Sequence, residues 1–257
     1  MLKICLIIVL IILIICSIKK NTEYYIENPN DYYLSLTTIP SRLNNIIPTL
    51  KSFIDQKIKP LKIFLCIPHV SKRTGEKYVI PDELKQFIDK HRIVKIIRCK
   101  DYGPATKLLG LLETHKINKN IIIGDDDRIM ERDWTEKLIE EHYNNPFSII
   151  TGEIGQWSDD RFLAKIPWGS AGILFPANSI GNDIFYFHKK LEKECRYVDD
   201  VFWYKYFYEL NGMPIVKAEG VNLKQEYNSV NALFRETGEL ERYGDNGKQI
   251  KCFNSNI

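Results

Sequence analysis

From Asp31 onward, the chain alternates short apolar runs with amphipathic stretches. The apolar runs are rich in isoleucine and other β-branched residues, which favour strands covered on both faces. The stretches between them place apolar residues at helical spacing. The pattern predicts strands at 32–38, 62–67, 94–99, 120–124 and 148–153, and helices at 44–56, 82–90, 104–114 and 133–143. Strands separated by helices indicate right-handed βαβ units, and therefore an α/β fold with a mostly parallel, Rossmann-like sheet flanked by helices.

The chain beyond Gly155 is less regular and is rich in glycine, proline and aromatic residues. One further helix is predicted there, at 198–210. No linker rich in glycine, serine or proline separates this region from the preceding one. We therefore expect a single domain over 31–257. The stretch 225–257 shows no clear pattern, and an acceptor loop, a lid and a disordered tail are all compatible with it.

The amino terminus differs in kind from the rest of the chain. Residues 4–18 are almost wholly apolar and are flanked by Lys3 and by Lys19-Lys20. This length is short for a bilayer span and suits a signal-peptide core or a thin-membrane anchor. Residues 14–17 lack the small-x-small cleavage pattern, which favours an uncleaved anchor. We expect a single-pass anchor at 1–20 in a secretory-pathway or other internal membrane, with a polar stem at 21–30; its orientation stays open.

Charge and cysteine content narrow the class of protein. The net charge is +3, and no basic block stands out, so a nucleic-acid partner is not expected. The six cysteines are scattered without a C-x-x-C pair or a His/Cys cluster, which argues against a zinc site. Cys195 and Cys252 stand alone, so no disulfide framework is indicated. The chain has no N-x-[ST] sequon, a mild argument against a glycosylating lumen.

Three consecutive aspartates, Asp125 to Asp127, follow the predicted strand at 120–124. In open α/β sheets, ligands bind beyond the carboxyl ends of the strands. Adjacent carboxylates raise each other's pKa unless a cation holds them, and oxygen ligands suit Mg²⁺ or Mn²⁺. In an extended chain, Asp125 and Asp127 point to one side and Asp126 to the other. We expect Asp125 and Asp127 to bind a metal ion and Asp126 to face the ribose or the protein; a solvated acidic turn is the alternative.

This D-x-D after the fourth strand resembles the metal-binding motif of GT-A-fold glycosyltransferases, in particular the glycosyltransferase-2-like enzymes. The segment at 101–107, D-Y-G-P-A-T-K, is similar to a G-P-A-T-K segment in a subgroup of nucleotide-diphospho-sugar transferases. The resemblance covers most of 32–220. It implies a GT-A fold with a nucleotide-binding half at 31–127 and an acceptor half at 128–257. It also implies Mn²⁺- or Mg²⁺-dependent transfer, with inversion, from a nucleotide sugar, expected to be a UDP-sugar, to a hydroxyl of a glycan, protein or lipid.

The resemblance assigns the segments after the first and third strands to the nucleotide sugar. The turn after the first strand carries Thr37, Thr38 and Arg42, groups that hydrogen-bond to base, ribose or phosphate. The turn after the third strand carries Asp101, to accept from base or ribose, and Lys107, to offset diphosphate charge at a helix amino terminus. The structural alternatives are an ordinary helix cap in the first segment and the start of a buried helix in the second.

Two later segments complete the expected site. Trp168 and Gly169 lie in a small-residue turn, where the family shapes its donor and acceptor pockets, and Trp157 and Trp168 are candidates to stack on sugars. A core role for either tryptophan is at least as well supported. Asp199 and Asp200 open the helix at 198–210, where inverting members place a general base. We assign that role to Asp200 first and Asp199 second; a helix N-cap is the alternative.

One departure concerns the metal ligands. Many metal-dependent members use a histidine near the carboxyl terminus, whereas the last histidine here is His188. The same acidic cluster also suits a nucleotidyltransferase or another metal-dependent phosphate enzyme. An inactive protein that still binds a sugar nucleotide is the third reading. The aspartyl-phosphatase pattern D-x-D-x-[TV] after the first strand is absent from the sequence.

Overall fold

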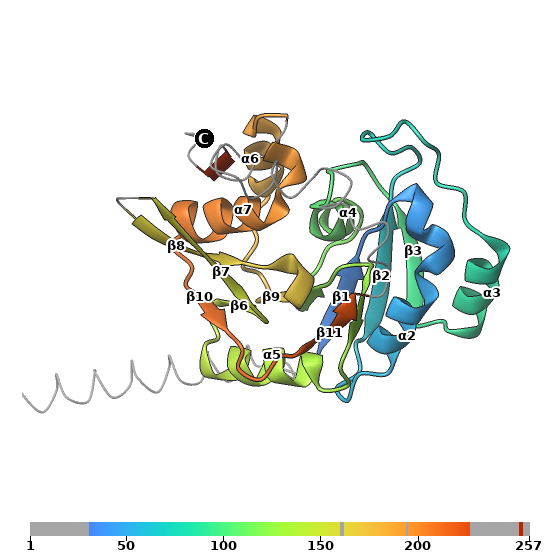
Figure 1. Ribbon diagram of the computed structural model, residues 1–257, viewed down its shortest axis with the longest axis horizontal. Helices are drawn as coiled ribbons and strands as arrows, with labels where there is room; N and C mark the ends of the chain where they lie inside the picture. Colours follow the sequence, from blue (N-terminus) through green and yellow to red (C-terminus); the bar gives the residue numbers. More distant parts are fainter. Residues whose placement is uncertain (1–30, 160–161, 194, 227–251, 254–257) are drawn as a thin grey trace, which may run out of the picture.

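A central sheet of seven strands organises the computed structural model, which describes residues 31–159, 162–193, 195–226 and 252–253 (Figure 1). The strands lie in the order β10–β6–β9–β4–β1–β2–β3. Their bounds are β1 Tyr32–Leu36, β2 Lys62–Ile67, β3 Val94–Arg98, β4 Asn120–Ile123, β6 Ile149–Thr151, β9 Ile173–Phe175 and β10 Ile215–Lys217. Strand β9 is antiparallel to β4 and β6, and the other neighbours are parallel. The predicted α/β fold with a mostly parallel sheet is confirmed.

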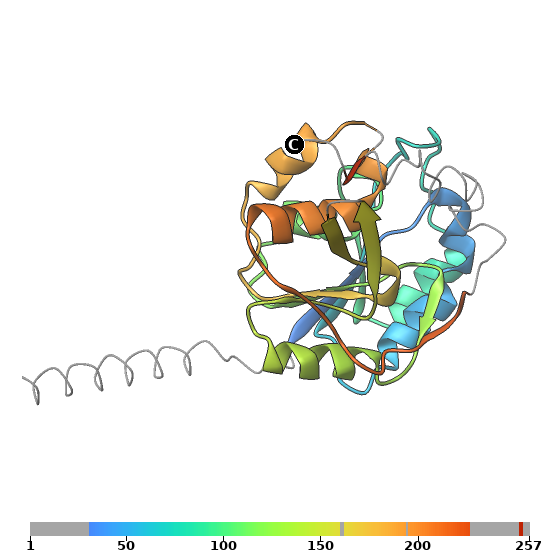
Figure 2. The same cartoon turned by 60° about the vertical axis from the view of Figure 1, so that its left-hand side comes forward.

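Helices cover both faces of this sheet (Figures 1 and 2). One face packs against α4 (Thr106–Thr114), α6 (Ile184–Lys190), α7 (Asp199–Trp203) and the π-helical segment η4 (Tyr204–Leu210). The other packs against the 3₁₀ segment η1 (Pro40–Asn45), α2 (Ile47–Ile54), α3 (Asp82–Lys90) and α5 (Trp134–Asn144). Strand β4 shows why: Ile121 and Ile123 enter the first core and Ile122 the second. Such alternation buries both faces of a strand, as its isoleucine run predicts.

Shorter elements flank the central sheet. Strands β7 (Ile154–Asp159) and β8 (Phe162–Pro167) form an antiparallel pair. Strand β5 (Arg128–Met130) follows the aspartates and pairs antiparallel with β11 (Leu223–Glu226). Two 3₁₀ turns, η2 (Gly169–Ala171) and η3 (Cys195–Tyr197), lie in the second half of the chain. Strands from both predicted halves share the one central sheet, so the two halves form a continuous structure.

The predicted elements of the first half are found, with changes at their ends. The strand at 62–67 and the helix at 82–90 match β2 and α3. The helix predicted at 44–56 is instead η1 followed by α2, because Pro40 and Pro48 each lie at the start of their own helix. The helix predicted at 198–210 changes from α to π geometry at Tyr204. Strand β9 and helix α6 were missed in the irregular region.

A disulfide joins Cys195 and Cys252, which lie 57 residues apart with their Cα atoms separated by 5.3 Å. Both side chains are buried. The sequence indicated no disulfide framework, and the structure corrects this, since spacing along a chain does not reveal pairing between distant segments. Cys66 and Cys99 are free thiols among the described residues.

Several predictions lie outside the described residues. These are the anchor at 1–20, the stem at 21–30, most of 225–257, and the side chain of Trp157. Within the described ranges, no helix combines the length and the apolar character needed to cross a membrane.

Candidate functional site

The aspartate triplet lies at the carboxyl edge of the sheet, directly after β4. Gly124 continues the pairing with β1, because its N–H donates to the Ser35 carbonyl at 3.2 Å. A β-carbon at Gly124 would lie 2.8 Å from Phe53 Cζ, so only glycine lets the chain pass this close to the packed rings. Asp125 and Asp127 follow with partly exposed side chains, of which 29% and 17% are accessible. The carboxylates that follow β4 therefore lie at the carboxyl edge of the sheet, as the sequence predicts.

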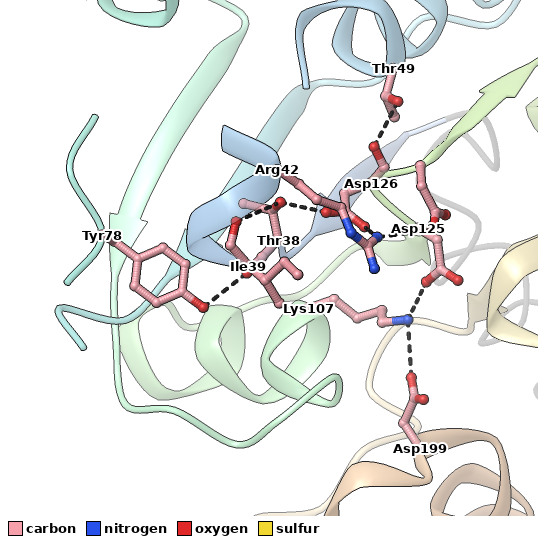
Figure 3. A network of polar contacts seen from close by, with 10 residues as sticks. Thr38, Ile39, Arg42, Thr49, Tyr78, Lys107, Asp125, Asp126 and Asp199 are labelled. Carbon is pink, nitrogen blue, oxygen red and sulfur yellow. Dashed lines mark hydrogen bonds and ion pairs between the residues drawn. The ribbon is translucent and has the colours of Figure 1, made fainter. Parts of the chain in front are cut away.

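Asp126 turns toward the protein and is held there by Arg42 of η1, by Thr38 just before η1 and by Thr49 of α2 (Figure 3). Arg42 Nη1 lies 2.5 Å from Asp126 Oδ1 and 2.9 Å from Asp127 Oδ2. The Thr38 hydroxyl donates to the second oxygen of Asp126, and the Thr49 hydroxyl donates to its backbone carbonyl at 2.9 Å. Of the two directions expected for Asp126, this is the one toward the protein. Thr38 and Arg42, predicted to contact the nucleotide, are here the partners of the aspartates.

Lys107 joins the aspartate triplet to the second acidic segment (Figure 3). It lies in the first turn of α4, with only 4% of its side chain exposed. Its Nζ lies 2.5 Å from Asp125 Oδ1 and 3.0 Å from Asp199 Oδ2. Burial would lower the pKa of Lys107, but the charges of Asp125 and Asp199 raise it above its usual range. Two acidic segments that are distant in the sequence thus share one buried cation.

Asp200 is oriented by the turn that carries Gly169. The backbone N–H of Gly169 donates to Asp200 Oδ1 at 2.9 Å. A β-carbon at position 169 would lie 3.3 Å from this oxygen and 3.3 Å from Lys107 Nζ, tighter than an ordinary contact. Asp199 is buried in the same first turn of α7, and Asp200 is partly exposed. The predicted pair therefore divides into a buried member held by Lys107 and a more accessible member held by a backbone amide.

The local charges give these carboxyls different affinities for protons. Burial would raise the pKa of Asp125, but Lys107 beside it holds that pKa below its usual range. Burial and the charges of Asp126 and Asp125 raise the pKa of Asp127 to about 6. Burial and the charge of Asp199 raise the pKa of Asp200 to about 7. The raised pKa values of Asp127 and Asp200 therefore bring the titration of these two carboxyls toward neutral pH.

The cluster contains more acidic than basic side chains, which bears on metal binding. Five aspartates interact here with three basic side chains, those of Arg42, Lys107 and Arg128. Within the described part of the chain, no three His, Cys, Asp or Glu side chains are grouped as a ready-made metal site. Mg²⁺ in phosphate-handling enzymes is commonly held by one or two carboxylates together with substrate phosphates and water. Asp125 and Asp127 fit that arrangement, since they are partly exposed and belong to a cluster with more acidic than basic side chains.

The other predicted site residues have different neighbours. The Thr37 hydroxyl donates to the Cys66 carbonyl at 2.7 Å. Asp101 accepts from the N–H of Lys72 at 2.6 Å and from the N–H of Gly103 at 2.7 Å, so it orders its own loop. Trp168 is half-buried, and its indole lies so close to Gly155 that a β-carbon there would come within 2.1 Å of Nε1. The structure therefore does not draw Thr37, Asp101 or Trp168 into the aspartate network.

Some supporting residues were not found from the sequence. Arg128 follows the triplet and lowers the pKa of Asp125 and Asp127 through its charge; its position next to three acids was an available signal. Ser35 is a polar residue inside a buried strand, and its hydroxyl donates to the Lys107 carbonyl. The Tyr78 hydroxyl donates to the Thr38 carbonyl at 3.0 Å, and no sequence pattern pointed to it.

Comparisons with known proteins show which solved structures have a similar fold. No protein-family model and no curated protein matches the sequence. A solved structure of the mannosyltransferase PcManGT from Pyrobaculum calidifontis, in complex with GDP-Man and Mn²⁺, matches 76% of this chain with a TM-score of 0.51 and 10% identity. This chain spans 56% of the length of that one.

Two weaker matches are S. aureus TarS and a 4-diphosphocytidyl-2C-methyl-D-erythritol synthase from Anaerococcus prevotii. The TarS match has a TM-score of 0.49 and 13% identity, and covers 75% of this chain and 59% of that one. The synthase match has a TM-score of 0.48 and 14% identity, and covers 80% and 95%. At these sequence identities a match indicates the fold alone, and both TM-scores are too low to support a further argument. The mannosyltransferase match supports the expected fold: a GT-A-like, Rossmann-like α/β architecture around a mostly parallel sheet.

Proposed function

We propose that this chain is a metal-dependent glycosyltransferase that moves a sugar from a nucleotide sugar to a hydroxyl group of a glycan, protein or lipid. The observation that carries the proposal is the meeting of two acidic segments at the carboxyl edge of the sheet. Lys107 contacts Asp125 of the first segment and Asp199 of the second, and Asp127 and Asp200 belong to the same two segments. A transfer between a diphosphate leaving group and a hydroxyl nucleophile needs two such sites, one for each reactant. The donor we propose is a UDP-sugar, on the resemblance of the motifs alone.

The first acidic site would receive the diphosphate. Asp125 and Asp127 would hold Mn²⁺ or Mg²⁺, and the bound ion would neutralise charge on the departing diphosphate. Arg42 keeps Asp126 and Asp127 in place through contacts of 2.5 and 2.9 Å. Thr37, Thr38 and Asp101 line the loops after β1 and β3 at the same edge of the sheet, where we propose that the nucleoside binds.

The second site would activate the acceptor. Asp200 is held through one carboxylate oxygen by the Gly169 N–H, and its pKa of about 7 leaves a large ionised fraction at neutral pH. The ionised carboxylate takes the proton of the acceptor hydroxyl, whose oxygen forms a bond to the anomeric carbon. The bond from that carbon to the diphosphate oxygen breaks, and its electron pair leaves on the diphosphate. A single displacement of this kind inverts the anomeric configuration.

Compartment and anchoring are part of the proposal. The Cys195–Cys252 disulfide supports an oxidising environment for the domain, such as a secretory lumen or the cell exterior. The apolar residues 4–18 would tether the domain to the membrane as a single-pass anchor. Together these features favour an orientation with the domain on the oxidising side of the membrane.

The test is a screen of nucleotide sugars with Mn²⁺, in which release of the nucleoside diphosphate is measured. The wild type is expected to release it from at least one donor, and Asp127→Asn to lose that activity. Asp82→Asn is the matched control, because Asp82 lies on α3 with 86% of its side chain exposed. Release of pyrophosphate from a nucleoside triphosphate and a sugar phosphate would identify a nucleotidyltransferase instead. Failure to bind UDP with Mn²⁺ in calorimetry would favour an inactive protein.

A further inference from the structure

Lys107 is the residue whose surroundings differ most from its expected role as a phosphate ligand. Lysine is almost never fully buried unless it is paired, and here 4% of the side chain is exposed. Its backbone is fixed as well as its ammonium group. The Ser35 hydroxyl of β1 donates to the Lys107 carbonyl, and the residues of α4 from Thr106 to Leu111 are buried. The backbone that carries the Lys107 ammonium is therefore fixed in position.

The two carboxylates on this ammonium come from different parts of the site. Asp125 follows β4 on the side proposed for the diphosphate, and Asp199 opens α7 on the side proposed for the acceptor. The Nζ distances of 2.5 and 3.0 Å place both within ion-pair range of one cation. Removing the cation would leave Asp199 buried and unpaired, an expensive arrangement for a charge.

Gly169 closes the same unit from the other side. Its N–H donates to Asp200 at 2.9 Å, and a β-carbon there would lie 3.3 Å from the Lys107 ammonium and 3.7 Å from Asp199 Oδ2. The ammonium, the two aspartates of α7 and the glycine turn are thus packed against one another. A shift of Lys107 would displace the first turn of α7, and Asp200 with it.

We infer that Lys107 is a positioning residue, which fixes the acceptor-side aspartates relative to the donor-side carboxylate rather than binding the diphosphate itself. It pairs with Asp199, and Asp200 is then the member of the pair that takes the proton of the acceptor. The inference rests on the proposed function for its catalytic meaning, whereas the ion-pair arrangement can be tested without any substrate.

The substrate-free arm is a double-mutant cycle on thermal unfolding, with Lys107→Met, Asp199→Asn and the double variant. Lys107→Met is expected to lower Tm by roughly 6–20 °C, the range for breaking a buried ion pair. Adding Asp199→Asn to it should restore part of that loss, because the unpaired charge is gone. Lys85→Met is the matched control: Lys85 pairs with Asp82 on the surface, so its Tm should change by less than about 4 °C. A Lys107→Met shift no larger than that of the control, or a further loss in the double variant, would overturn the inference.

The second arm separates positioning from phosphate binding, with UDP and Mn²⁺ as the binding probe. A positioning role predicts that Lys107→Met lowers kcat about 100-fold, as small displacements of reacting groups do, while the Kd for UDP changes by less than about 3-fold. Lys107→Arg, which keeps the charge, should recover part of kcat. A large rise in the Kd for UDP with kcat near the wild-type value would show that Lys107 binds the diphosphate and would overturn the inference.

The unfolding experiment and the kinetic experiment can fail separately. If Lys107→Met does not fold, Asp199→Asn serves alone: it should lower kcat and leave the Kd for UDP near the wild-type value, because Lys107 still holds Asp125. An unchanged kcat and Tm in Asp199→Asn would contradict the inference. If the wild type neither binds UDP nor turns over a nucleotide sugar, the proposed function fails, and the unfolding cycle still decides whether Lys107 couples the two segments.

Discussion

Asp200→Asn tests the assignment of the general base with little change in shape. Asparagine has nearly the same volume, and its side-chain oxygen can still accept the Gly169 N–H that now lies 2.9 Å from Asp200. Loss of a positioned base costs about 10²- to 10⁴-fold in rate. We therefore expect kcat/KM for transfer to fall by that factor, with Asp199→Asn losing less because Asp199 is held by Lys107.

The pH dependence of the wild type should report the same carboxyl. Burial and the charge of Asp199 raise the pKa of Asp200 to about 7. Because the base acts in its ionised form, kcat/KM should rise with pH and level off above about pH 7. Below that value the rate should fall about tenfold per pH unit. In Asp200→Asn this limb of the profile should disappear.

The raised pKa of Asp200 also makes the stability of the folded protein depend on pH. The folded-state pKa of about 7 lies above the ordinary aspartate value of 3.8, so protonated Asp200 favours folding. That contribution is fully present below about pH 4 and is lost as the pH rises through about 7. A shift of about three pKa units corresponds to at most about 4 kcal/mol, and we expect roughly 1–3 kcal/mol because the site is partly open to solvent.

Metal-free Asp200→Asn should therefore be more stable than the wild type at pH 8 by roughly 1–3 kcal/mol, and about equal to it at pH 4. Denaturant unfolding at the two pH values measures this, with exposed Asp82→Asn as the control. The reasoning is refuted if Asp200→Asn keeps the wild-type rate, if the wild-type profile is flat from pH 5 to 8, or if the variant is less stable at pH 8.

Three further predictions concern the supports of the site. Arg42→Met leaves Asp126 buried without its ion-pair partner and should cost about 3–5 kcal/mol in unfolding free energy. Arg132→Met removes one partner of an exposed ion pair and should cost at most about 1 kcal/mol. Equal losses in the two variants would contradict this prediction. Replacing Cys195 and Cys252 by serine should cost about 2–5 kcal/mol, read from denaturant unfolding, and an unchanged midpoint would argue against the disulfide. Chelation with EDTA should abolish transfer and Mn²⁺ should restore it, while full activity in EDTA would exclude the metal-dependent proposal.

The parts of the fold that were predictable are those specified by local pattern. The isoleucine run at 121–123 predicted a buried strand, and chain order then placed Asp125 to Asp127 at its carboxyl end. Helix α3 was found with both ends, because its acidic first turn and amphipathic face are strong local signals. Strand β9 was missed, because its short apolar run lies in a glycine- and proline-rich stretch where strand and turn signals overlap.

The site was predictable as a set of residues and not as a set of contacts. Parallel strands bring their carboxyl ends to one edge, and the sequence assigned both Asp125, as a metal ligand, and Lys107 to the diphosphate there. Which partner each charge takes depends on how α7 packs against α4, and that packing is long-range. The sequence therefore predicted that Lys107 contacts the diphosphate, whereas in the structure its ammonium lies between Asp125 and Asp199. The Cys195–Cys252 bond was hidden for the same reason.

The central claim is that the site breaks the bond between a sugar and a nucleoside diphosphate. Phosphorus NMR of the products formed from a nucleotide sugar, with Mn²⁺ and the wild-type chain, tests this most directly. We predict signals of the nucleoside diphosphate with the wild type and their absence with Asp127→Asn. Signals of a nucleoside monophosphate and a sugar phosphate, or the same products from wild type and Asp127→Asn, would contradict it.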